Sequence, residues 1–365
     1  MNYSNIIFDK KSNKEHIMKL IPYLDYSPQV GSDCSSDRWV SIIGRTNVGD
    51  RCHFEDLVTL RGDGDFIDVG SDCWFGEYST VHISDTTFGA IVSDEVTVGR
   101  FSLVHACKIG KGCVLGEHAV VMDNASVGAG SVICADSVVP PGKQLEPGWI
   151  YQGVPAKPIR KIDAKELKEL RNIVRLKTDG IGADLVHSND PVAAIKCIPG
   201  EGVSENSDES FYIAPTAAVV GHLDMAAESS IWFSVEIDAE HASVQVGSST
   251  NIQDNSRIHL DPGESLKMGE RVTIGHNVQL SACEIGDDCI VGMGSKIGKG
   301  TIIRNGGVVA AGAVTAPNTI VTEGMIWSGN PATESRALSK ENIKLFSLGV
   351  DVYRLYAKNY KKNSQ

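Results

Sequence analysis

The chain has 365 residues, enough for two or three domains with a sizeable core, and it combines 37 glycines with only 6% aromatic residues. This composition favours a fold with many tight turns, and the net charge of −12, without a basic stripe, argues against nucleic acid and anionic membranes as partners. No apolar run approaches the roughly 18 residues of a spanning helix, and the first residues lack the apolar core of a signal peptide. We therefore expect a cytoplasmic protein.

Nine cysteines are spread along the chain, an odd number, and no two of them form a CxxC pair. Several occupy apolar positions, as in "GCVLG" and "DCIVG". We interpret them as reduced thiols in the core of a cytoplasmic protein, with a thiolate metal cluster as the alternative.

The first segment in chain order is an N-terminal extension over residues 1–30, in which we expect a short helix at 13–21. A repeat domain follows at 31–178. Stretches such as "KIGKGCVLGEHAVV" place Ile, Val or Leu about every six residues, usually followed by a glycine or another small residue. This hexapeptide pattern predicts a left-handed parallel β-helix, in which each hexapeptide forms one short strand on one face of a triangular prism.

The same repeat returns at 211–365. Gly44 matches Gly221 at an offset of 177 residues, and Gly153 matches Gly329 at an offset of 176. We therefore predict a mostly β fold of two left-handed parallel β-helices, related by a tandem duplication and each followed by an α-helix.

The helices are expected at 163–177 and 339–362, where Asp163 and Ser339 supply capping side chains. Residues 179–210, rich in Gly, Asp and Ser, are predicted to form a linker between the two domains.

The matched segments "TVGRFSLVHACKIG" and "TIGHNVQLSACEIG" keep one histidine each, but not the same one. The first copy has His105 where the second has Ser281. The second copy has His276 where the first has Arg100.

Several motifs together resemble the γ-class carbonic anhydrases and their relatives. They are "LRGD" at 60–63, a histidine 21 residues after its arginine, the "IGH…LxxC" phrase and the closing "GxPA". The resemblance covers about 40–160 and 212–338. It implies a trimer or trimer-like assembly of β-helices with zinc sites between neighbours, which hydrate carbon dioxide reversibly to bicarbonate.

Carried over residue by residue, the resemblance implies that His82 and His105 are the two metal ligands of one β-helix and that His276 is the ligand given by its neighbour. It also assigns Arg61 and Asp63, the arginine and aspartate of "RGD", to the catalytic site.

The second copy departs from this pattern, because Asp238 and Glu240 replace the arginine and aspartate and Ser281 replaces a ligand. It keeps the family's glutamine as Gln253, where the first copy has Gly76.

Three imidazoles leave one zinc position open, and zinc brings the pKa of a bound water to about 7, as carbon dioxide hydration requires. Serine and arginine cannot replace imidazole as zinc ligands at neutral pH. One complete site therefore needs both copies, although a closed three-fold ring cannot alternate them, because three is odd. The sequence leaves open whether iron replaces zinc.

Two other functions stay open. A hexapeptide-repeat acyltransferase would use His82 or His105 as a general base near a subunit interface. A non-catalytic scaffold or binding protein would carry degenerate metal sites.

Overall fold

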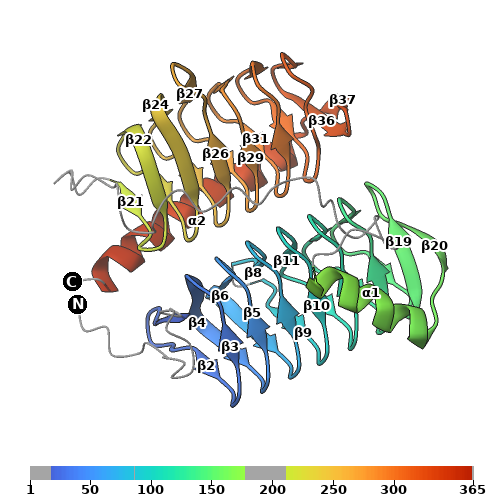
Figure 1. Cartoon of the computed structure of the whole chain (residues 1–365). Helices are drawn as coiled ribbons and strands as arrows, with labels where there is room; N and C mark the ends of the chain where they lie inside the picture. The colour runs from blue at the N-terminus through green and yellow to red at the C-terminus, as the bar shows by residue number, and fades with distance from the viewer. Residues whose placement is uncertain (1–17, 86, 177–210, 364–365) are drawn as a thin grey trace. The chain divides into compact units, whose positions relative to one another are not determined.

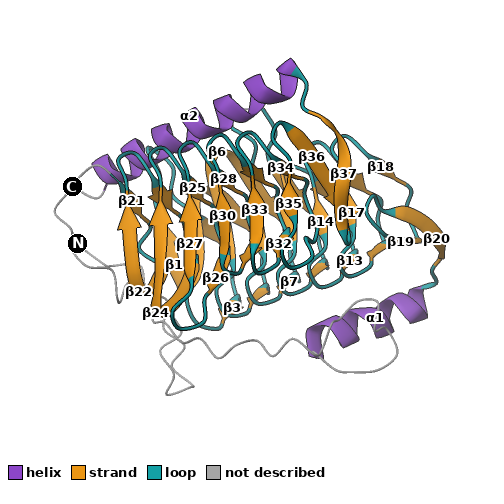
Figure 2. Cartoon of the chain, turned by 90° about the horizontal axis from the view of Figure 1, so that it is seen from above, coloured by secondary structure: helices purple, strands orange, loops and turns teal. Residues whose placement is uncertain are grey.

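The computed structural model describes residues 18–85, 87–176 and 211–363, and the chain divides into two compact units, Met1–Ala193 and Ala194–Gln365. Each unit is a β-helix of short parallel strands followed by one α-helix (Figures 1 and 2). The predicted fold class is therefore confirmed. The linker predicted at 179–210 lies outside the described residues.

The first unit is a three-sided prism whose faces are parallel ladders. Two long strands, β4 (Val40–Val48) and β6 (Thr59–Val69), bend round one corner and belong to two of the faces. The short N-terminal strands β1 (Met18–Ile21) and β2 (Gln29–Val30) pair with β4. The first face continues through β8 (Thr80–His82), β11 (Leu103–His105), β14 (Val120–Val121) and β17 (Val138–Val139). The second continues through β9 (Ala90–Val92), β12 (Lys108–Ile109), β15 (Ser126–Val127) and β18 (Gln144–Leu145). The third consists of β3 (Ser35–Ser36), β5 (His53–Phe54), β7 (Trp74–Phe75), β10 (Thr97–Val98), β13 (Val114–Leu115), β16 (Val132–Ile133), β19 (Trp149–Gln152) and the antiparallel β20 (Lys157–Lys161).

The second unit repeats this plan. One sheet consists of β21 (Tyr212–Ile213), β23 (Ser230–Ile231), β25 (Asn251–Ile252), β28 (Thr273–Ile274), β31 (Ile290–Val291), β34 (Val308–Val309), β36 (Met325–Gly329) and the antiparallel β37 (Ala332–Ala337). The other is built around the long strands β22 (Ala218–Met225) and β24 (Glu236–Val246), and continues on one side through β26 (Arg257–His259), β29 (Gln279–Leu280) and β32 (Lys296–Ile297) and on the other through β27 (Ser265–Met268), β30 (Cys283–Ile285), β33 (Thr301–Ile303) and β35 (Ile320–Val321).

Residues of successive coils stack in register, and the inward positions form apolar columns. On the third face of the first unit, Val98 pairs with Leu115, which pairs with Ile133, and all three side chains are buried. In the second unit, Ile252 and Ile274 stack in the same way. The six-residue spacing works because it returns a branched apolar side chain to the interior on every face.

Helix α1 (Ala164–Leu176) packs against β10 and β13, and α2 (Lys340–Asn363) packs against β23. Each begins as predicted. Asp163 Oδ1 accepts a hydrogen bond of 2.9 Å from the Glu166 amide, and Ser339 Oγ accepts one of 3.2 Å from the Asn342 amide.

The short helix predicted at 13–21 is wrong for residues 18–21, which form strand β1 and pair in parallel with β4. Met18 is buried among the apolar residues of the first coils. Pairing with an open ladder edge satisfies backbone groups that a single helical turn would leave unsatisfied. Residues 13–17 lie outside the described part of the chain.

The cysteines within the described ranges are all free thiols. Burial raises the pKa of the Cys113 thiol to about 11 and that of Cys283 to about 12, so these side chains are inert at neutral pH. Among the helices of the described residues, none is long and apolar enough to cross a membrane.

The close stacking of coils makes a test possible with two glycines. A Cβ at Gly110 would lie 2.6 Å from the Ala129 amide nitrogen of the next coil, whereas a Cβ at Gly349, inside α2, meets nothing within 4 Å. We expect Gly110→Ala to destabilise the protein by about 1–3 kcal/mol through overpacking and Gly349→Ala to stabilise it by up to about 1 kcal/mol through helix propensity. Denaturant unfolding of both variants measures this, and an unchanged midpoint for Gly110→Ala would contradict the stacking.

Candidate metal centre

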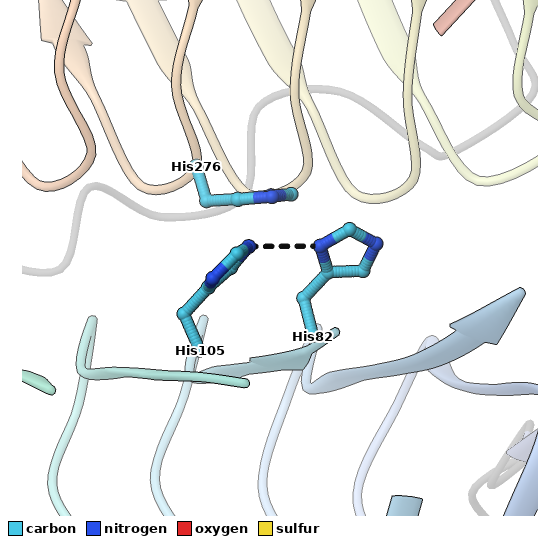
Figure 3. A group of neighbouring side chains, drawn as sticks. All are labelled: His82, His105 and His276. Atoms are coloured by element: carbon cyan, nitrogen blue, oxygen red, sulfur yellow. Dashed lines mark hydrogen bonds between the residues drawn. The ribbon is translucent and has the colours of Figure 1, made fainter. Parts of the chain in front are cut away.

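His82 and His105 come from adjacent coils of the first unit. They are the last residues of β8 and β11, where they pair in register, so both side chains project from the same face. His82 Nδ1 lies 3.2 Å from His105 Nε2, as the dashed line in Figure 3 shows. Both side chains are almost completely buried.

A carboxylate faces the other ring nitrogen of each of these histidines. Asp63 Oδ1 lies 3.4 Å from His82 Nε2, and Asp123 Oδ1 is hydrogen-bonded to His105 Nδ1. A ring nitrogen that faces a carboxylate can donate its proton to that carboxylate, and the hydrogen bond between His82 Nδ1 and His105 Nε2 needs a proton on one of these two nitrogens. A metal cation could take the place of this proton and accept a lone pair from each ring.

Arg61 fixes the first of these carboxylates. It lies beside His82 in the strand register, and its Nη1 donates a 2.5 Å hydrogen bond to Asp63 Oδ2. Both side chains are buried. The structure therefore brings together Arg61, Asp63, His82 and His105, the four residues that the sequence assigned to the first copy.

His276, also labelled in Figure 3, lies in the turn that follows β28 of the second unit. Its Nδ1 lies 3.1 Å from Asp254 Oδ2, and its Nε2 lies 3.3 Å from the Tyr353 hydroxyl of α2. The Asp254 carboxylate is held in turn by the Phe233 amide, which donates to Oδ1 at 3.0 Å. A carboxylate therefore lies close to one ring nitrogen of His276, as it does for the two histidines of the first unit.

Comparison with known proteins gives the family. The family model "Bacterial transferase hexapeptide (six repeats)" matches residues 265–299. The protein YrdA of Escherichia coli K12 is 35% identical over 158 residues, which are 42% of this chain and 86% of YrdA, and a carbonic anhydrase of Geobacillus kaustophilus is 32% identical over 156 residues, 43% of this chain and 85% of the relative. The chain belongs to the γ-carbonic anhydrase-like family. Mitochondrial gamma carbonic anhydrase 1 of Arabidopsis thaliana is 36% identical over 152 residues, 40% of this chain, and the matched part spans 55% of that relative.

Against this family pattern, the remaining site positions of the two copies have taken other partners. Arg100, which stands in place of His276, donates to Glu117 Oε1 at 2.6 Å in a buried ion pair. His259, the counterpart of His82, lies 3.0 Å from Asp238 and leaves 63% of its side chain exposed.

The other lost positions show the same divergence. Ser281 directly follows β29, next to the His259 end of β26, and offers a hydroxyl where the first copy has an imidazole. Glu240 is 72% exposed, in contrast to the buried Asp63. The histidine positions of the two copies therefore differ in burial and in their partners.

Sequence reasoning missed the carboxylates that face His105 and His276, and it missed Tyr353. Asp123 could have been found from the sequence, because it follows His105 by 18 residues. A coil of this part of the β-helix is 18 residues long, so residues at this separation lie next to each other on adjacent coils. Asp254 directly follows the family's glutamine, Gln253, on the coil before His276. Tyr353 had no such signal, because its contact depends on how α2 packs.

The buried Arg61–Asp63 pair can be tested directly. Asp63→Asn keeps the shape of the side chain but removes the charge that compensates the guanidinium, so we expect the free energy of unfolding to fall by about 3–5 kcal/mol. Glu240→Gln, the matched change at the exposed position of the second copy, should stay within about 0.5 kcal/mol of the wild type. Equal stability of the two variants in urea unfolding would show that the pair is not buried as described.

Proposed function

We propose that the protein is a metal-dependent carbonic anhydrase, which hydrates carbon dioxide reversibly at a site shared between its two copies. His82 and His105 of the first copy and His276 of the second would be the metal ligands. The observation that carries the proposal is the carboxylate opposite the ligating nitrogen of each histidine, at Asp63, Asp123 and Asp254.

The donor set fits a divalent metal. Histidines that bind metals usually donate their other ring N–H to a carboxylate or carbonyl, which fixes the tautomer and raises the basicity of the ligand. Three neutral imidazoles suit zinc with one open position, and imidazole also suits iron. When bound, the metal supplies the Lewis acidity that makes water a nucleophile at neutral pH.

The other residues have positioning and binding roles in this proposal. Asp63 orients His82 and Asp123 orients His105. The guanidinium of Arg61 holds Asp63 through a buried ion pair, and in this proposal the Arg61–Asp63 pair forms the polar wall beside which a bicarbonate anion binds. In this proposal the second copy supplies one ligand but lacks these groups. Asp238 replaces the arginine with an acidic residue, and Glu240, at the position of Asp63, is exposed.

A site of this kind needs the two copies to meet, either within one chain or between chains of a trimer or trimer-like assembly. In this proposal a second site, in which Arg100 and Ser281 stand in place of two histidine ligands, binds no metal and is inactive.

Metal content is the decisive measurement. We expect the purified protein to hold about one zinc or iron per chain, and we expect His105→Ala and His276→Ala each to lose this metal and all carbon dioxide hydration, since two imidazoles hold zinc weakly. His259→Ala is the matched control and should keep both, because its site has Ser281 in place of a ligand. If His276→Ala retains the metal, or if the wild type never carries any, the shared site is wrong and the scaffold hypothesis replaces it.

The carboxylate of Asp123 offers an independent test. Asp123→Ala should weaken metal affinity by about 10- to 100-fold, because His105 then loses the acceptor that fixes its tautomer. Lys299→Ala changes the matched position of the second copy, where the side chain pairs with Asp261 and Glu264, and should leave the affinity unchanged. Competition against a chromogenic chelator gives both values, and equal affinities would contradict the assigned role.

A further inference from the structure

Helix α2 places a hydroxyl on the nitrogen of His276 that a metal would use. The Tyr353 oxygen lies 3.3 Å from His276 Nε2. The other ring nitrogen, Nδ1, lies 3.1 Å from Asp254 Oδ2, and an ionised carboxylate can only accept. We therefore assign the ring proton to Nδ1, which makes Nε2 the acceptor and the tyrosine O–H the donor.

The position of this hydroxyl is set by packing and is independent of the histidine. The Tyr353 ring lies edge-on to Trp232, with centroids 5.0 Å apart and an interplanar angle of 82°, and edge-on to Tyr356 at 5.8 Å. The next residue of the helix, Arg354, forms an ion pair with Glu228. The hydroxyl is thus held at Nε2 by a rigid aromatic cluster of the second unit.

The matched position of the first copy cannot make this contact. The offset of 176 residues matches Tyr353 with Lys177, which has no hydroxyl, and Arg100 stands in place of His276. The tyrosine therefore accompanies the copy that kept this histidine.

We propose that Tyr353 is a competing hydrogen-bond donor that occupies the ligating nitrogen of His276 in the metal-free protein and is displaced when a metal binds. The inference rests on the proposed function, since it needs His276 to be a ligand. Asp254, 3.1 Å from Nδ1, holds the ring from the other side, so the hydroxyl is not needed to orient it. A metal held at Nε2 would replace only the hydrogen bond from the tyrosine, which would keep its proton, and the ring would lose none.

This exchange makes metal uptake by the protein weaker than its ligands alone would allow. Removing the hydroxyl removes the competing bond, and a single hydrogen bond of this kind corresponds to an affinity change of about two- to ten-fold. Tyr353→Phe should therefore bind metal more tightly than the wild type, whereas the loss of a merely structural contact would weaken binding or leave it unchanged.

The test is cobalt(II) titration of the metal-free full-length protein, followed by visible absorption, for the wild type and three variants. We expect Tyr353→Phe to lower the Kd for cobalt about two- to ten-fold and His276→Ala to abolish binding. Tyr356→Phe, which removes a hydroxyl from the same aromatic cluster, should leave the Kd unchanged. An equal gain in Tyr353→Phe and Tyr356→Phe would trace the effect to a loosened helix and overturn the inference.

The outcomes separate the inference from the proposed function. If His276→Ala loses cobalt while Tyr353→Phe binds no more tightly than the wild type, the inference fails and the shared site stands. If His276→Ala binds like the wild type, both fail. Imidazole nitrogen NMR of the metal-free protein gives a readout without metal, because Tyr353→Phe should shift the His276 Nε2 resonance and Tyr356→Phe should not; an unshifted resonance also overturns the inference.

Discussion

Both β-helices of this protein depend on the register in which one coil stacks upon the next. Because parallel strands pair without slippage, a residue's neighbours on the adjacent coils are fixed by the number of residues in a coil. The same rule that stacks Val98 on Leu115 in the core stacks His82 beside His105 on the outside. Side chains on adjacent coils are therefore brought together by their positions in the strands alone, as His82 and His105 are.

The repeat makes the fold easy to read from the sequence. Branched apolar residues at six-residue spacing determine the strands, and the constant offset between the copies determines the duplication, so the prism and both helices could be predicted. The N-terminal strand β1 could not, since "MKLI" has no hexapeptide pattern and becomes a strand only because β4 offers an edge to pair with. Its structure is a property of the neighbouring coil.

The site shows the same division between local and tertiary information. Arg61, Asp63, His82 and His105 were identified from motifs, and the register accounts for their meeting. Asp123 belongs to no motif, although the coil length places it above His105. Tyr353 lies 77 residues from His276 in the chain, and only the packing of α2 on the Trp232 cluster brings the two together. Motifs indicate the groups that touch a ligand, whereas the groups that orient them depend on packing.

The buried Arg100–Glu117 pair has a consequence for how the duplication can change further. The second copy has Met293 where the first has Glu117. Arg100 thus occurs with a glutamate that can pair with it, whereas His276 occurs with an uncharged residue at that position. Replacing Arg100 by histidine alone would leave a carboxylate buried without the cation that compensates it. A histidine at position 100 would thus require a second substitution, at Glu117, to avoid this cost, so a single mutation does not make the two copies alike at this position.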